Sequence, residues 1–288
     1  MTLGRAAQAR SLVVACVALA CGSSCTKAPP DAGAARLEFH DEGRWISTVT
    51  LAELEKKIPV ETLTAYDPYY GKPKTFRVLA FDKVLKVGFP QIEKPGEREL
   101  LLRAKDGYTV PMRPPLSTEP GAYIAIADVD APGWEPIGPQ RANPAPFYFV
   151  WKEPSQQNLE THPRPWQLAA IEIARFEVTF PHTIPSGEGN GSPAWKGFHI
   201  FRDRCIRCHA VNREGGRVGP ELNVPKNVLE YRTAAEVRAY VKNPLSLRYG
   251  NMPAHPDLSD ADLDGLIAYF TVMKGQKHDP AASSDGGH

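Results

Sequence analysis

The sequence predicts a multidomain protein in which an α+β region is followed by an all-α region. Between residues 37 and 180, short apolar or alternating runs are bounded by Gly, Pro and Asp, as strands usually are. Between residues 194 and 275, apolar positions recur with helical spacing behind capping residues. Residues 181–193 are rich in Pro, Gly and Ser, and we interpret them as an interdomain linker. The 288 residues are enough for two domains with a core in each.

The segment 1–25 has the features of an export signal. Arg5 and Arg10 precede an apolar stretch at residues 11–20, which is too short to span a bilayer comfortably. The run ALAC that ends at Cys21 is similar to a bacterial lipobox, although the favoured leucine would sit one place earlier. We therefore expect a lipoprotein-type signal with lipidation at Cys21. Simple cleavage nearby, with a soluble periplasmic product, stays open.

The α+β region is predicted to begin after a Pro/Ala/Gly tether at residues 26–36. It extends over residues 37–180, and its sequence patterns predict both short helices and short strands. The helices are expected at residues 51–57 and 81–87, and the strands at residues 76–80, 100–104, 123–129, 147–151 and 171–180.

Three helices are predicted in the all-α region. The first has Ser192 as its N-cap and runs to about Arg204. The second opens with a capping box at Thr233 and stops before Pro244. The third opens with a capping box at Ser259 and ends at the start of the polar tail. That tail, residues 276–288, is expected to be disordered.

The cysteine content narrows the chemistry of the all-α region. Cys16, Cys21 and Cys25 lie in the signal or at its border, so the mature chain holds only Cys205 and Cys208. A structural zinc site usually takes four protein ligands, often from two cysteine pairs, and there is no second pair in the sequence. A thioredoxin-like pair would have a βαβ pattern around it, whereas these residues have a helical pattern.

The segment Cys205-Ile206-Arg207-Cys208-His209 has the pattern of a c-type haem attachment site. Each thiol adds to one vinyl group of the haem, and the adjacent imidazole is held beneath the iron as an axial ligand. We therefore predict one covalent haem c, bound by Cys205 and Cys208 and ligated by His209. One haem stores one electron, so this region is predicted to carry out electron transfer.

Residues 194–275 resemble class I cytochrome c. Gly197 and Phe201 match the glycine and the aromatic residue of that family's first helix, and Tyr269 matches the aromatic residue of its last helix. Gly219-Pro220 resembles the family's turn after the haem motif. The resemblance implies that the carbonyl of Pro220 accepts the proton of the second ring nitrogen of the ligand histidine, which fixes its tautomer.

The resemblance also implies a methionine as the second axial ligand. Met252 lies in the sequence YGNMPA, which is similar to the family's methionine loop, and Met/His ligation raises the reduction potential. His255 is the alternative ligand, although we interpret it as a surface residue at the haem edge. Met273, at the end of the last helix, is expected to pack or to face solvent. Six-coordinate iron leaves no open position for a substrate, which favours an electron carrier over an enzyme.

Three arginines near the motif have open roles. Arg207, Arg213 and Arg217 are candidates for pairing with haem propionates or for a docking rim, and a plain solvated role is equally compatible with the sequence.

The α+β region resembles, more loosely, the sulfite-oxidase-like molybdopterin-binding fold. The resemblance rests on DPYYG at residues 67–71, FRVLAFD at 76–82, KDGYTVP at 105–111 and PWQL at 165–168. Enzymes of that family bind molybdenum through a cysteine thiolate, and no cysteine occurs between Cys25 and Cys205. We therefore expect no molybdenum cofactor, and a docking or ligand-binding role for this region.

Taken together, the sequence predicts a periplasm-facing monohaem c-type cytochrome, held at a membrane by a lipid anchor. It would pass single electrons between a partner oxidoreductase and a respiratory chain. The net charge of +1 gives no argument for a nucleic-acid partner. One alternative is a haem-containing part of an oxidoreductase whose first region binds a cofactor or substrate; another is a haem-based redox sensor. An enclosed polar pocket would favour the enzyme, and an apolar exposed face near the haem edge would favour docking.

Overall fold

The structure is a computed structural model that describes Met1 and residues 35–138, 140–247 and 250–280. The predicted export signal and the lipidation site at Cys21 lie outside the described residues, as does most of the tether. From Ala35 onward, the described residues belong to one compact unit. Within these residues, no helix has the length and apolar character needed to cross a membrane.

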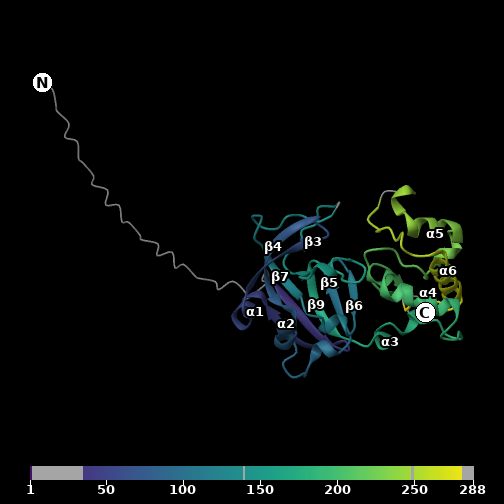
Figure 1. The fold of residues 1–288 in the computed structure, drawn as a ribbon, viewed down its shortest axis with the longest axis horizontal. Coiled ribbons are helices and arrows are strands. Elements are labelled where there is room, and N and C mark those ends of the chain that lie inside the picture. The colour runs from purple at the N-terminus through teal and green to yellow at the C-terminus, as the bar shows by residue number, and fades with distance from the viewer. Residues whose placement is uncertain (2–34, 139, 248–249, 281–288) are drawn as a thin grey trace. The chain divides into compact units, whose positions relative to one another are not determined.

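The N-terminal region is β-rich and contains two sheets, coloured purple to teal in Figure 1. In the first sheet the strand order is β2-β1-β9-β5-β6, and only β1 and β9 run parallel. Strand β6 lies at one edge, where its proline, Pro111, is compatible with pairing on one side only. The strands of this sheet are β1 (Arg36–Asp41), β2 (Arg44–Thr50), β5 (Leu100–Ala104), β6 (Thr109–Met112) and β9 (Leu168–Ile173).

The second sheet is antiparallel throughout, with the order β3-β4-β7-β8. Strand β8 has the sequence YFVW, and all four residues are buried because both faces of the strand are covered. Phe149 and Trp151 face the main core, whereas Tyr148 and Val150 face a smaller cluster of aromatic side chains. The strands are β3 (Glu61–Asp67), β4 (Lys72–Ala80), β7 (Ala122–Asp128) and β8 (Tyr148–Trp151).

Two short helices complete the main core of the β-rich region. Helix α1 (Leu51–Lys57) begins with a capping box in which the side chains of Thr50 and Glu53 bond each other's backbone amides. Helix α2 (Phe81–Gly88) buries its apolar face in the core shared by the two sheets. Both helices therefore begin where the sequence predicted them.

The C-terminal region is helical and is coloured green to yellow in Figure 1. Its helices are α4 (Pro193–Asp203), α5 (Ala234–Lys242) and α6 (Asp260–Lys274), and the predicted N-caps Ser192, Thr233 and Ser259 each accept a backbone hydrogen bond. Helices α4 and α6 pack closely, since a Cβ on Gly197 would collide with the carbonyl of Gly265. The protein is thus multidomain, with a β-rich region followed by a helical one.

Short elements connect these larger ones. A two-stranded hairpin lies just after the predicted haem motif, with strands β10 (Ala210–Val211) and β11 (Glu214–Gly215). The 3₁₀ helices are η1 (Pro95–Glu97), η2 (Leu116–Thr118), η3 (Pro154–Gln156), η4 (Pro181–Thr183), η5 (Cys205–Arg207), η6 (Val228–Glu230) and η7 (Pro244–Ser246).

The strand predicted at residues 171–180 is only partly correct. Strand β9 ends at Ile173, and a short helix, α3 (Phe176–Thr179), follows it. Phe176 and Phe180 are four residues apart, so a helical turn places both on one side, where they join the hydrophobic core of the helical region. The ring centroid of Phe176 lies 5.9 Å from that of Phe198 in α4.

The expected linker at residues 181–193 packs against the helical region at its start. Thr183 is fully buried, and its carbonyl accepts a hydrogen bond of 2.8 Å from the hydroxyl of Tyr269. The side-chain amide of Asn212 donates to the carbonyl of His182 at 2.7 Å. The first part of this segment is therefore a packed connection.

The first residues of the expected disordered tail also belong to the folded unit, which corrects the sequence prediction. The carbonyl of Gln276 accepts a hydrogen bond of 2.9 Å from the side chain of Asn212. Asp279 forms an ion pair of 3.0 Å with Arg213. These side-chain contacts hold residues 276–280 in place, and residues 281–288 lie outside the described part of the chain.

Candidate functional site

The predicted haem motif lies immediately after helix α4. Gly197, Phe201 and Cys205 recur every fourth residue, so α4 directs one face toward the motif. The helix ends at Asp203, and 3₁₀ helix η5 contains the first cysteine. The backbone amide of His209 then donates to the carbonyl of Cys205 at 2.9 Å, which folds the motif into a compact turn.

The two cysteines of the motif are free thiols and are partly buried. Burial raises the pKa of the Cys205 thiol to about 12 and that of the Cys208 thiol to about 11. Both therefore stay protonated at neutral pH. A redox-active dithiol needs a lowered thiol pKa, because the thiolate is its nucleophile, so the environment argues against that alternative.

The imidazole of His209 is oriented by a backbone carbonyl. Its Nδ1 donates to the carbonyl of Pro220 at 2.8 Å, which is the hydrogen bond expected at this turn, and the lone pair is left on Nε2. Gly219 packs directly on the ring, since a Cβ there would lie 2.7 Å from Nδ1. Burial lowers the pKa of His209. The neutral ring can therefore offer Nε2 to a metal.

Met252 reaches the same hydrophobic core as the motif. It is half-buried and packs, like Cys205, against the core cluster of the helical region. Residues 248–249, which precede it in the predicted methionine loop, lie outside the described residues. The other methionine after the motif, Met273, is buried at the end of α6 and packs in the core.

His255 is buried, which corrects the expectation of a surface residue. It is 6% exposed, because the loop after Met252 folds back onto α5 and its backbone amide donates to the carbonyl of Val241 at 3.0 Å. Among the described residues, its Nδ1 has no hydrogen-bond partner. Burial lowers the pKa of this imidazole, so the neutral form is favoured.

The three arginines near the motif have different partners. The guanidinium of Arg207 donates to the backbone carbonyls of Leu159 and Glu160 in the β-rich region, at 3.3 and 2.7 Å. Its side chain is only 11% exposed, so it is not a solvated residue. Arg213 forms the ion pair with Asp279 described above. The backbone amide of Arg217 donates a hydrogen bond of 3.1 Å to the carbonyl of Gly107 in the β-rich region.

A chain of buried asparagines behind the motif is the feature that the sequence analysis missed. Asn223 donates to the side-chain oxygen of Asn212 at 2.7 Å and to the carbonyl of Met273 at 2.9 Å. Asn227 donates to the side-chain oxygen of Asn223 at 2.7 Å and to the carbonyl of Phe270 at 2.9 Å. These asparagine side chains donate hydrogen bonds to carbonyls at the end of α6 and thereby connect that helix to the loop after the motif. The spacing of the two last asparagines, four residues apart, was the only available signal.

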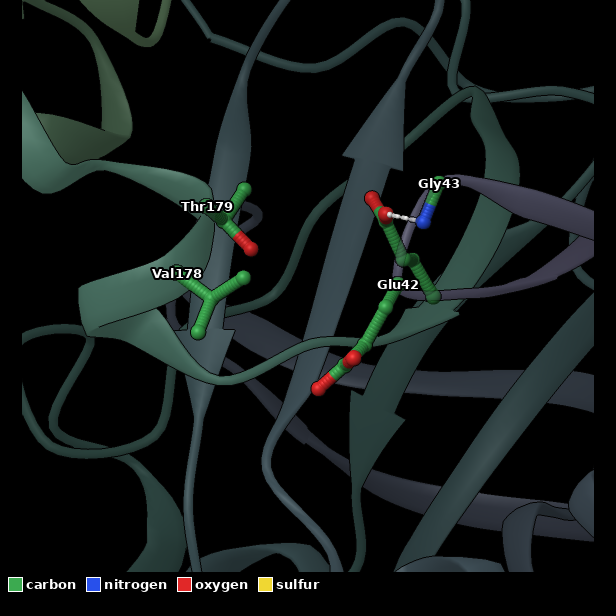
Figure 2. Close-up of a pocket in the computed structure, with 5 residues that line it drawn as sticks. Glu42, Gly43, Val178 and Thr179 are labelled. Carbon is green, nitrogen blue, oxygen red and sulfur yellow. Dashed lines mark hydrogen bonds between the residues drawn. The ribbon is translucent and has the colours of Figure 1, made fainter.

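A small cavity of about 170 Å³ lies on the β-rich region, as Figure 2 shows. Its two carboxylates already have partners. Glu172 accepts a hydrogen bond of 2.9 Å from the backbone amide of Gly43, and Glu42 accepts one of 2.8 Å from Arg175. Paired carboxylates of this kind stabilise the fold and do not indicate a substrate site. The lining residues are Glu42, Gly43, Glu172, Val178 and Thr179.

Comparison with known proteins identifies the helical region. Residues 192–270 match the family model described as cytochrome c oxidase, cbb3-type, subunit III. Cytochrome c oxidase subunit 2 of Alkalihalophilus pseudofirmus is 38% identical over 87 residues, which cover 27% of this chain and 25% of that protein. The C-terminal region is a cytochrome c domain. The chain spans about a quarter of the length of this relative, so the likeness is confined to a part of each protein.

A cytochrome c domain implies haem c and electron transfer, and the residues around the motif fit that cofactor. The two thiols, three residues apart, would add to the vinyl groups of the haem, and the neutral imidazole oriented by Pro220 would ligate the iron, with the thioether of Met252 on the same core cluster. Gly219 packs against the His209 ring, and the bond to Pro220 engages Nδ1, so the lone pair is left on Nε2.

Proposed function

We propose that this protein is a monohaem c-type cytochrome that passes single electrons between a partner oxidoreductase and a respiratory chain. The observation that carries the proposal is the arrangement of His209 within the cytochrome c domain. Its Nδ1 is engaged by the carbonyl of Pro220 at 2.8 Å, directly beside two free thiols. A haem iron held at such a site accepts and releases one electron.

Each residue of the site has a distinct role in the proposal. Cys205 and Cys208 hold the haem covalently. His209 and Met252 would ligate the haem iron, and Pro220 orients the imidazole and increases its basicity. The thioether of Met252 favours reduced iron and thereby raises the reduction potential. A haem held by these residues would supply one-electron transfer, and two protein ligands would leave the iron no position for a substrate.

Exposed apolar side chains near the methionine loop support docking to a redox partner protein. Leu245 is 66% exposed and Leu247 is 56% exposed, on the segment that leads to Met252. Two large exposed aliphatic side chains two positions apart favour an interaction surface on this segment. The cavity on the β-rich region has its carboxylates paired, so it gives no support to the alternative of an oxidoreductase with a substrate site there.

For the β-rich region, the sulfite-oxidase-like fold stays a prediction, and so does its docking or ligand-binding role. The sequence has no cysteine between Cys25 and Cys205 to ligate molybdenum. Metal analysis of the purified full-length protein tests this: we expect iron without molybdenum. Stoichiometric molybdenum would contradict the prediction and would favour the enzyme.

The proposed location is the bacterial periplasm or the outer face of a membrane, with a lipid anchor at Cys21. The support is the signal-like sequence before that residue, and haem attachment in bacteria occurs on the same side of the membrane. A Cys21→Ser variant is expected to move from the membrane fraction to the soluble fraction, followed by the haem spectrum. A membrane fraction that is unchanged in this variant would contradict the lipid anchor.

The central experiment measures covalent haem and its axial ligands. Full-length protein expressed with a haem attachment system should keep its haem after denaturation, whereas Cys205→Ser with Cys208→Ser should lose it. A low-spin spectrum with a weak methionine-to-iron band near the red edge of the visible is expected, and Met252→Ala should remove that band. A high-spin wild-type iron that binds carbon monoxide readily would contradict ligation by Met252.

The sensor alternative makes a different prediction about the β-rich region. A haem-based sensor should change conformation between its oxidised and reduced forms, whereas a carrier should not. Hydrogen exchange compared in the two redox states separates them, and equal protection of the β-rich region in both states is the result that the carrier predicts.

A further inference from the structure

Glu160 of the β-rich region contacts both segments that carry the proposed axial ligands. Its backbone carbonyl accepts a hydrogen bond of 2.7 Å from Arg207, which lies between the two cysteines of the motif. Its carboxylate lies 3.6 Å from Nδ1 of His255, which follows Met252 by three residues. One residue thus joins the histidine side of the site to the methionine side.

The contacts of Glu160 are sheltered from water. The side chains of Arg207, His255 and Glu160 are 11%, 8% and 28% exposed. Charge interactions are stronger in such surroundings than at the open surface, because the effective dielectric constant is lower. Among the described residues, Nε of Arg207 and Nδ1 of His255 are buried without a hydrogen-bond partner, and the Glu160 carboxylate lies 3.9 Å from Nη1 of Arg207 and 3.6 Å from Nδ1 of His255.

The loop that presents Glu160 is itself held in place. The side chain of Asn158 accepts a hydrogen bond of 2.8 Å from the backbone amide of Glu160, and its carbonyl accepts one of 2.7 Å from the amide of His162. At the next residue, the carbonyl of Pro163 accepts a hydrogen bond of 3.1 Å from the indole of the buried Trp151. Contacts within the β-rich region therefore hold the backbone of the loop at Glu160.

Other contacts also join the β-rich region to segments next to the haem motif. Strand β6 lies against η5, which contains the first cysteine. The carbonyl of Gly107 accepts a hydrogen bond of 3.1 Å from the backbone amide of Arg217, and a Cβ on Gly107 would lie 2.8 Å from the Cβ of Arg217. Arg113 forms an ion pair of 3.0 Å with Asp203 at the end of α4. Glu160 acts within an extended contact, so its geometry is not that of an isolated surface pair.

We propose that Glu160 is a positioning residue of the haem site, which clamps the segment bearing Met252 to the segment bearing His209. The inference rests on the haem attachment and methionine ligation proposed above. A thioether on a loop remains on the iron only while the loop keeps its place, and the contact between Glu160 and His255 restrains that loop. The β-rich region thereby contributes to the redox centre of the cytochrome c domain.

The test compares Glu160→Gln with wild type in the full-length, haem-loaded protein. The variant should keep its covalent haem but show a weaker methionine-to-iron band, a lower reduction potential, and binding of added imidazole that is faster by about tenfold, as expected when the loop that carries Met252 loses a packing restraint. Glu160→Asp should restore part of each property. Glu55→Gln is the matched control, because Glu55 pairs with Arg77 at 3.0 Å within the β-rich region.

A double-mutant cycle shows whether Glu160 acts through His255. If it does, Glu160→Gln combined with His255→Gln changes the imidazole binding rate no more than either substitution alone. Additive effects would overturn the clamp, as would a Glu160→Gln protein whose band, potential and binding rate equal those of wild type. Should Glu160→Gln fail to fold, His255→Gln alone tests the same contact, because it removes the other partner. A wild-type protein without covalent haem would instead overturn the proposed function, and this inference with it.

Discussion

The β-rich region and the cytochrome c domain both bury polar side chains, but in different chemical forms. In the β-rich region the side chains of Lys74 and Asp128 are fully buried, 2.8 Å apart, and Lys74 also pairs with Glu135 at 3.1 Å. In the cytochrome c domain the buried polar side chains behind the motif are the amides of Asn212, Asn223 and Asn227 described above. The β-rich region thus buries charged pairs besides neutral groups such as Gln156, whereas the cytochrome c domain buries neutral amides.

A second charged cluster follows the same pattern in the β-rich region. Arg164 and Asp67 are each 1% exposed and lie 3.4 Å apart, and Asp67 also accepts a hydrogen bond of 2.7 Å from Tyr148. The guanidinium of Arg164 donates to the carbonyl of Trp151 at 3.2 Å. These pairs join strands and loops that are far apart in the sequence, so they fix the arrangement of long connections.

The difference predicts how each region responds to loss of one partner. Removing one member of a buried ion pair leaves an uncompensated charge, whereas removing an amide leaves neutral groups unbonded. Loss of an ion-pair member should therefore lower the free energy of unfolding more, by an amount that depends on pH. Loss of an amide should lower it less, by an amount that does not depend on pH.

The largest effect is expected for Asp128→Ala, which leaves Lys74 buried without its closest partner. The free energy of unfolding of the β-rich region should fall by about 3 to 5 kcal/mol. Chemical denaturation followed by tryptophan fluorescence measures it. Lys72→Met is the control, because Lys72 pairs with Glu135 at 2.9 Å while half exposed, and its loss should cost less than about 1 kcal/mol. Equal losses in the two variants would contradict the role of burial.

Gly197→Ala should disturb the cytochrome c domain by overpacking. A Cβ there meets the carbonyl of Gly265 across the contact between α4 and α6, and the expected cost is about 1 to 3 kcal/mol. Thermal unfolding followed by the haem absorbance measures it. Gly189→Ala is the matched control, since a Cβ on Gly189 has nothing within 4 Å. A fully tolerated alanine at position 197 would show that these helices can separate without loss.

Asn223→Ala should destabilise the cytochrome c domain by about 1 to 2 kcal/mol, because the side chains of Asn212 and Asn227 and the carbonyl of Met273 each lose a hydrogen-bond partner. The loss should be the same at pH 5 and pH 8, as the groups involved are neutral. Denaturation at the two pH values tests this. A loss that varies with pH would show that these side chains are coupled to Glu221, whose carboxylate accepts hydrogen bonds from the backbone amides of Asn212 and Asn223.

Glu135 provides the smallest effect, which appears only in acid. Hydrogen bonds from Lys72 and then Lys74 lower the pKa of its carboxyl below the ordinary value of 4.5. Because the folded pKa is the lower one, the stabilisation is complete above pH 4.5 and is lost as pH falls through the folded value. Glu135→Gln should remove this part of the acid dependence, measured as the unfolding free energy between pH 6 and pH 3. An unchanged slope would contradict the ion pairs.

The helical features were predictable from the sequence because they are local. The caps at Ser192, Thr233 and Ser259 act within three residues, and the haem motif occupies five consecutive positions. Strands β1, β2, β3 and β6 were not predicted, since their pairing is set by distant partners. Strand β1, for example, pairs in parallel with β9, placing Phe39 beside Ile171.

The surroundings of the site were less predictable than its central residues. The expectation that His255 is exposed was wrong because nothing nearby in the sequence shows that its loop folds back onto α5. Arg207 likewise has its partners at Leu159 and Glu160, almost fifty residues before it. Contacts of this kind depend on how two regions pack, and a local motif carries no information about that.

The contacts of Arg207 bear on how the protein matures. Arg207 lies between the two thiols proposed to bind the haem, and its guanidinium donates to the carbonyls of Leu159 and Glu160. Both thiols are partly buried, so contact between the two regions limits access to them. We therefore expect the β-rich region to close over the motif only after the thiols have reacted. Association of the two regions would then be a late step of biogenesis, and a chain without haem would remain recognisable to proteases.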